Sequence, residues 1–106
     1  MAETEALAVL RKITAEGMSL SELINAAGRY TASGEAELAE QIYKIWIQFN
    51  AEHPQLFIAL FNCSALQSSI GQGEAAMANL ERAIALNSDF LPAYINLGGL
   101  RERAGG

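Results

Sequence analysis

The chain has 106 residues, of which 51% are hydrophobic, and this is enough for one small domain with an apolar core. A formal net charge of −5 and scattered basic residues argue against a nucleic-acid-binding surface. No apolar run approaches the roughly 18 residues that span a bilayer, so no membrane association is expected. Residues 1–5 lack the basic start of a signal peptide, which favours a cytoplasmic protein.

The residues that usually carry chemistry are scarce. Cys63 is the only cysteine and lies in the apolar run 57–63, so we interpret it as a small core residue. His53 is the only histidine and stands beside Pro54 in a predicted turn, without a second metal ligand nearby. We therefore expect neither an enzyme nor a bound metal or cofactor.

The chain begins with an expected amphipathic helix over residues 2–16. Leu7, Leu10 and Ile13 recur at helical spacing and predict one apolar stripe. Gly17 ends the segment. We assign residues 1–17 to an N-terminal helix that caps one end of the helical array.

Two further helices are predicted on either side of Gly34. Ser19 and Glu22 match a capping box, which predicts that a helix begins there and continues to Ser33. The next helix covers residues 35–50, and so short a connection requires the two helices to be antiparallel.

The helix over residues 35–50 is apolar on more than one face, and Trp46 belongs to this broad apolar surface. The pattern favours a helix buried between neighbours, and it leaves open an interface with another molecule.

The second half of the chain repeats this pattern. One helix is expected from about Leu56 to Ile70, a turn at residues 71–73, and another helix over residues 74–86. A last helix comes after these, with Pro92 in its first turn, where a missing N–H group is tolerated.

The junction at residues 83–98 carries a family signature. Tyr94 lies near the opening of a predicted helix, three residues before the pair Leu97 and Gly98. A small residue and a turn come before this helix. This arrangement resembles the tetratricopeptide repeat, a helical hairpin of about 34 residues. The resemblance implies an all-α, antiparallel helix-hairpin solenoid of about six helices in a right-handed superhelical array.

Aligning the chain with itself in this register gives two complete repeats and a part of a third. The first is residues 20–56, three residues longer than usual, and the second is residues 57–90. Residues 91–106 provide only the first helix of a third repeat.

Residues 41–47 and 83–98 more narrowly resemble the N-terminal repeats of bacterial O-linked N-acetylglucosamine transferase-like proteins of the SPINDLY type. In that family the repeats precede a glycosyltransferase domain. The resemblance implies that this chain corresponds to the non-catalytic repeat segment, which binds a protein or peptide.

Asn25, Asn62 and Asn96 occupy the same position in the three first helices. First helices line the concave face of a hairpin solenoid, and an amide both donates and accepts hydrogen bonds, which suits a peptide backbone. The resembling glycosyltransferases bind extended substrates through such an asparagine row. The alternative is that each amide bonds the neighbouring repeat. The expected walls of the groove are Ile24, Phe61, Ile95, Ala65 and Gly99.

A second hypothesis is self-association. The lone last helix exposes Tyr94, Leu97 and Leu100 if no helix comes after it, and the Trp46 helix offers further apolar surface. Exposing several large apolar side chains costs roughly 1.5–3 kcal/mol each. This predicts a cover, either downstream sequence or a second copy of the chain in a homodimer.

Overall fold

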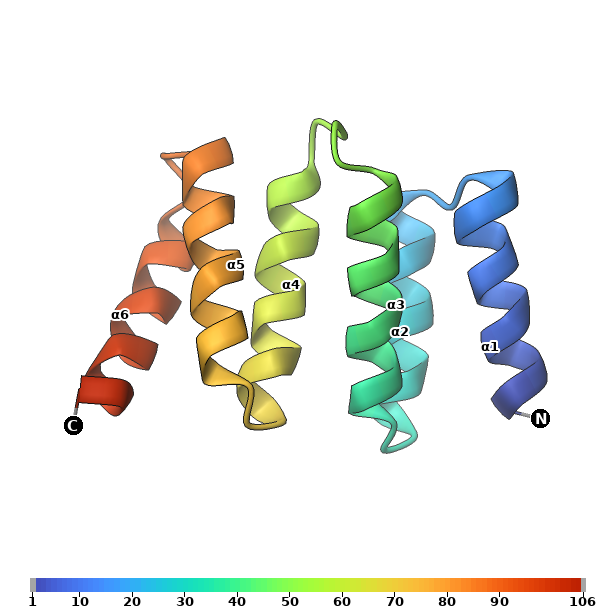
Figure 1. Ribbon diagram of the computed structural model, residues 1–106, viewed down its shortest axis with the longest axis horizontal. Helices are drawn as coiled ribbons and strands as arrows, with labels where there is room; N and C mark the ends of the chain where they lie inside the picture. The colour runs from blue at the N-terminus through green and yellow to red at the C-terminus, as the bar shows by residue number, and fades with distance from the viewer. Residues whose placement is uncertain (1, 106) are drawn as a thin grey trace. The chain divides into compact units, whose positions relative to one another are not determined.

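The computed structural model describes residues 2–105, with side chains from residue 5 onward, and this part of the chain is all-helical, without a strand. The all-α prediction is therefore confirmed. The chain divides into two compact units, Met1–Ala51 and Glu52–Gly106 (Figure 1).

The first unit contains three α-helices, α1 (Ala2–Arg11), α2 (Leu20–Ala32) and α3 (Ala36–Phe49). A short π-helix, η1 (Lys12–Glu16), continues from α1. Helices α2 and α3 pack against each other, and α1 and η1 both contact α3. The predicted antiparallel pair is thus present, and the N-terminal helix packs on it.

The predicted capping box begins α2. The backbone N–H of Glu22 donates to the Ser19 hydroxyl at 3.1 Å, and the backbone N–H of Ser19 donates to the Glu22 carboxylate at 3.0 Å. Two backbone donors at the helix start are satisfied in this way.

The hairpin turn between α2 and α3 is a Schellman motif. The N–H of Glu35 donates to the Tyr30 carbonyl at 2.8 Å, and the N–H of Gly34 donates to the Thr31 carbonyl at 3.1 Å. Gly34 has a φ of 84°, a left-handed conformation that a residue with a Cβ adopts only at a cost.

The N-terminal helix differs from the prediction in its winding and in its buried face. The Thr14 hydroxyl donates to the Leu10 carbonyl at 2.9 Å, the carbonyl that the Thr14 N–H would engage in a regular α-helix, and the chain is wound as a π-helix there. Leu7, expected in the apolar stripe, is 63% exposed, whereas Val9 and Ile13 are buried.

Trp46 has no exposed surface, which corrects its assignment to a self-association face. Its side chain is 0% exposed, and its indole N–H donates to the Met18 carbonyl at 2.7 Å. Burial between neighbours is therefore the interpretation that the structure supports, because a fully covered side chain has no area to offer a partner.

The second unit contains α4 (Leu56–Ser69), α5 (Gly73–Leu86) and α6 (Leu91–Gly105). Helix α5 packs against both α4 and α6. The turn between α4 and α5 repeats the Schellman motif of the first unit: the Gln72 N–H donates to the Gln67 carbonyl at 2.7 Å, and Gly71 has a φ of 84°.

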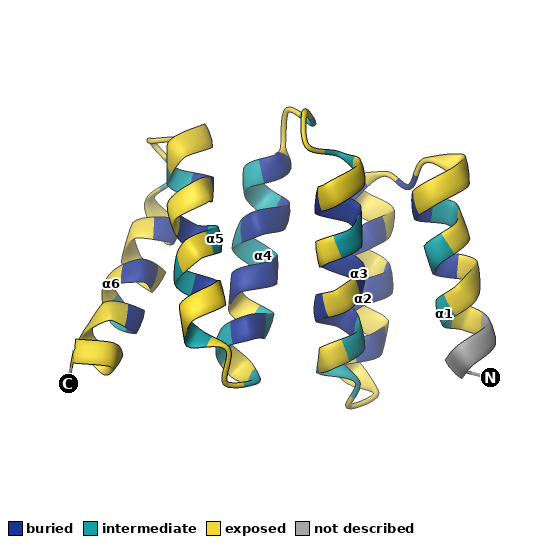
Figure 2. Ribbon diagram, in the orientation of Figure 1, coloured by how far each residue is buried: buried dark blue, intermediate teal, exposed yellow. Residues whose placement is uncertain are grey.

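In the repeat alignment, the positions at which the two helices of a hairpin pack against each other carry buried side chains in both units, and Figure 2 marks the buried parts of each helix in dark blue. In the first unit these are Leu23, Ala26, Ala27, Tyr30, Ala39, Tyr43 and Trp46. In the second unit they are Leu60, Cys63, Ser64, Ala76, Leu80 and Ala83.

Two of the three apolar residues that were expected to be exposed on the last helix are buried in α6. Leu97 and Leu100 are 5% and 8% exposed, since α6 packs on α5, so most of their surface is covered within the chain. Tyr94 is 44% exposed and Ile95 is 65% exposed. The uncovered apolar surface of α6 is therefore smaller than expected.

The hairpin glycine can be tested with a matched pair of substitutions. Gly34→Ala is expected to lower the free energy of unfolding by about 1–2 kcal/mol, because its φ of 84° is left-handed. Gly28→Ala in α2, where an added Cβ meets nothing within 4 Å, is expected to raise it by roughly 0.5–1 kcal/mol. Urea unfolding followed by far-UV circular dichroism measures both, and effects of equal sign would contradict the turn geometry.

Candidate functional site

A cavity of about 300 Å³ lies in the second unit and is formed mainly by α4 and α6. Leu80 of α5 and Leu100 of α6 are buried beneath it. The remaining lining residues are Ser64, Ala65, Ser68, Ile95, Asn96, Gly99 and Arg103. The cavity thus combines an apolar base with hydroxyl, amide and guanidinium groups.

A second cavity of about 360 Å³ adjoins it along the same unit. The two cavities share Ser68, Leu100 and Arg103 as lining residues. The second extends to the hairpin turn at Gly71 and to Met77 of α5. We call the two adjoining cavities together the α4–α6 groove.

Asn96 has a free side-chain amide in this groove. The residue is exposed, and within residues 2–105 its side chain forms no hydrogen bond. The same is true of Asn25 and Asn62, so in the described part of the chain none of the three amides bonds a neighbouring helix. Within each unit, their donors and acceptors are therefore available.

Of the predicted groove residues, the structure brings Ala65, Ile95, Asn96 and Gly99 together. Phe61 is half-buried and its ring packs edge-on against Phe90, with the centroids 5.1 Å apart. Asn62 is half-buried on α4 and does not line the two cavities.

Arg103 is a groove residue that the sequence analysis did not identify. It lines both cavities, and it has no ion pair within the described residues, whereas Arg101 bonds Glu81 at 2.9 Å. Its spacing from Asn96 places the two residues on one face of a helix, and that spacing is the signal that could have identified it.

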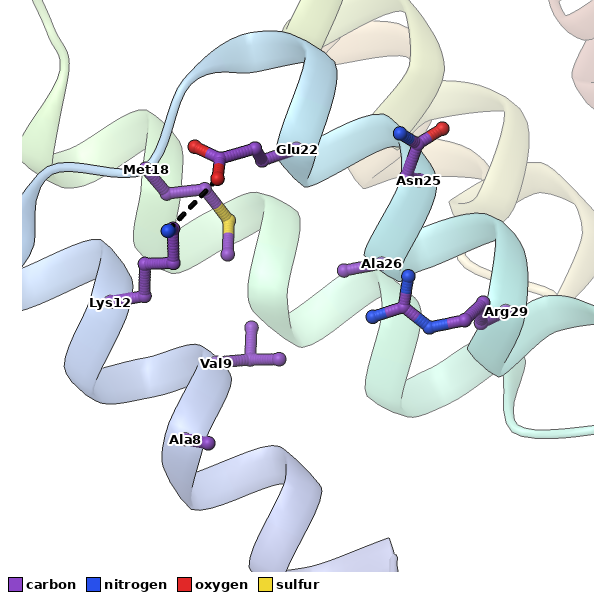
Figure 3. A pocket seen from close by; sticks show the side chains of 8 residues that line it. All are labelled: Ala8, Val9, Lys12, Met18, Glu22, Asn25, Ala26 and Arg29. Carbon is purple, nitrogen blue, oxygen red and sulfur yellow. Dashed lines mark ion pairs between the residues drawn. The ribbon is translucent and has the colours of Figure 1, made fainter.

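The remaining predicted residues, Ile24 and Asn25, lie on α2 in the first unit. Ile24 is 39% exposed. Asn25 lines a separate cavity of about 290 Å³ between α2 and the N-terminal helix, drawn in Figure 3. The other lining residues of this N-terminal cavity are Ala8, Val9, Lys12, Met18, Glu22, Ala26 and Arg29.

One ion pair crosses the N-terminal cavity. The Lys12 ammonium lies 2.9 Å from the Glu22 carboxylate (Figure 3). Hydrogen bonds from the Ser19 backbone and from Lys12 lower the pKa of Glu22 from its ordinary value of 4.5 to about 2. The hydrogen bond that Lys12 donates to Glu22 and the negative charge of Glu22 raise the pKa of Lys12. Both groups therefore stay charged at neutral pH.

Within the described residues, no group of three or more His, Cys, Asp or Glu side chains is arranged to hold a metal ion. In the same part of the chain, no helix has both the length and the apolar character needed to cross a membrane. No known family model, characterised protein or solved structure matches the chain.

The charge of Glu22 gives a pH-dependent contribution to stability. Because its folded pKa lies below 4.5, the contribution is present above pH 4.5 and is lost as the pH falls through about 2. We expect Glu22→Gln, which keeps an oxygen for capping, to be less stable than the parent at pH 7 and equal to it near pH 2.

Urea unfolding at the two pH values measures this difference. Glu52→Gln, in an exposed turn, is the control and is expected to leave stability nearly unchanged at pH 7. A Glu22→Gln effect of the same size at both pH values would contradict the assignment of the ion pair.

Proposed function

We propose that this chain is a non-catalytic protein–protein interaction module that binds an extended peptide or protein segment in the α4–α6 groove. The observation that carries the proposal is the adjacency of two cavities in one unit. The cavities, of about 300 and 360 Å³, share three lining residues, and the first holds Asn96, whose amide is free. Two adjoining cavities suit an extended chain better than a compact small molecule.

The chemistry of the groove matches a peptide backbone. Asn96 offers a donor and an acceptor, so it can bond a backbone N–H and C=O whatever side chains the peptide carries. Ile95 and Leu100 contribute apolar contacts, and Ala65 and Gly99 leave room close to the helix surfaces. We therefore expect a preference for small or apolar peptide side chains.

The proposal includes a tetratricopeptide-repeat architecture. Its support is that the hairpins α2–α3 and α4–α5 end their first helices with the same hydrogen-bonding pattern and a left-handed glycine, Gly34 or Gly71. The side chains at the packing positions of both hairpins are buried. The narrower part of the proposal, a repeat segment of a SPINDLY-type glycosyltransferase-like protein, rests on the sequence resemblance alone.

Selection of random octapeptides displayed on phage against the whole chain tests the proposal. We expect a recovered peptide to bind Asn96→Ala about fivefold more weakly in fluorescence anisotropy, since a lost hydrogen bond costs about 1 kcal/mol. Gly99→Leu is expected to fill the groove and weaken binding further. An added Cβ at Gly99 meets nothing within 4 Å, so the first atom of the new side chain causes no clash.

Gln48→Ala, an exposed amide on α3, is the matched control and is expected to bind like the parent. Because leucine is a better helix former than glycine, Gly99→Leu is also expected to unfold at a higher urea concentration, which separates loss of binding from loss of folding. Failure to select any peptide, or equal binding by all variants, would contradict the proposal.

A second candidate function is self-association through α6. It is favoured by three exposed apolar residues in the first turns of this helix, Leu91, Tyr94 and Ile95, whose exposures are 64%, 44% and 65%. Light scattering is then expected to detect a dimer, and Leu91→Glu is expected to dissociate it by placing a charge in the apolar contact. A monomer at millimolar concentration would exclude this function.

A further inference from the structure

The N-terminal cavity shares no residue with the α4–α6 groove and belongs to the other unit of the chain. It is formed by α1, the first residue of η1, the loop before α2, and α2 itself. Its volume of about 290 Å³ is enough for one side chain and its adjoining backbone. The sequence assigned this region only a capping role.

The charges in this cavity do not cancel. Lys12 and Glu22 neutralise each other at 2.9 Å. Arg29, one turn after Asn25 on α2, has no ion pair and no side-chain hydrogen bond within the described residues. Among the described residues that line the cavity, Arg29 is therefore the cation without an ion pair, on a chain whose net charge is −5.

The base of the cavity is apolar. Val9, Met18 and Ala26 are 9%, 6% and 2% exposed, and Figure 3 shows Val9 and Met18 pointing into the space between α1 and α2, with the Arg29 guanidinium extending toward it. A small inorganic anion would contact only the guanidinium and leave this surface uncovered. A ligand with an acidic end and a short aliphatic body would satisfy both parts.

We propose that the N-terminal cavity is a second binding site, which takes a glutamate side chain presented by an exposed segment of a partner protein. The two methylene groups of the glutamate lie on Val9, Met18 and Ala26. Its carboxylate receives hydrogen bonds from the Arg29 guanidinium, whose paired N–H groups match two carboxylate oxygens. The Asn25 amide, on the same face of α2, donates a further bond.

The existing ion pair contributes selectivity. Because Glu22 is held by the Ser19 N–H and by Lys12, it is not free to fold back onto Arg29. The site is independent of the α4–α6 groove and does not require that groove to bind a peptide.

Nuclear magnetic resonance titration of the whole chain tests this proposal with two probes, acetyl-Ala-Glu-Ala-amide and acetyl-Ala-Gln-Ala-amide. We expect the glutamate peptide to shift the Met18 methyl and Arg29 side-chain signals and to bind about three- to tenfold more tightly than the glutamine peptide. Arg29→Gln is expected to abolish that preference, and Asn25→Ala to reduce it.

Arg11→Gln is the matched control, since it removes the same charge from an exposed position outside the cavity. It is expected to leave the preference unchanged. Equal affinities for the two peptides, an Arg11→Gln effect as large as that of Arg29→Gln, or shifts confined to the groove residues around Asn96 would each overturn the proposal. Circular dichroism of each variant establishes that it is folded.

Discussion

The reversal of the chain at Gly34 and at Gly71 is the constraint on which the rest of the structure depends. Each glycine has a φ of 84°, and the residue after it bonds back to the carbonyl five residues earlier. The first helix of each hairpin must end there, and the second must return along it. The apolar faces of the two helices then meet, and burial of side chains such as Leu23 and Leu80 holds each pair together.

The proposed binding surfaces arise from the space that the hairpins leave unfilled. In the second unit α6 packs on α5, and small residues such as Ala65 and Gly99 do not fill the space between α4 and α6, which becomes the groove. In the first unit the Trp46 indole fixes the Met18 backbone at 2.7 Å. The loop before α2 is thereby tied to α3, and the N-terminal cavity lies between α1 and α2.

The sequence was sufficient for features that depend on local chemistry. The capping box at Ser19, the hairpin turns and the burial of Cys63 follow from residue type and spacing, and the structure has all of them. It was insufficient where the outcome depends on which face of a helix meets a neighbour. Periodicity favoured burial of the Trp46 helix without excluding an interface, and it did not show that Leu97 would be covered within the chain. Nor did it show that Arg29 and Arg103 would line cavities, because helical spacing gives the face on which a side chain lies and not the space left beside it.

The central claim is that the α4–α6 groove binds an extended peptide backbone. Intermolecular nuclear Overhauser effects between a selected peptide and the isotope-labelled chain test it most directly. We expect contacts from the peptide backbone amides to the Asn96 side-chain amide, with peptide side chains near Ile95 and Leu100. Contacts only to surfaces outside the two adjoining cavities, such as the exposed face of α3 around Gln48, would contradict it.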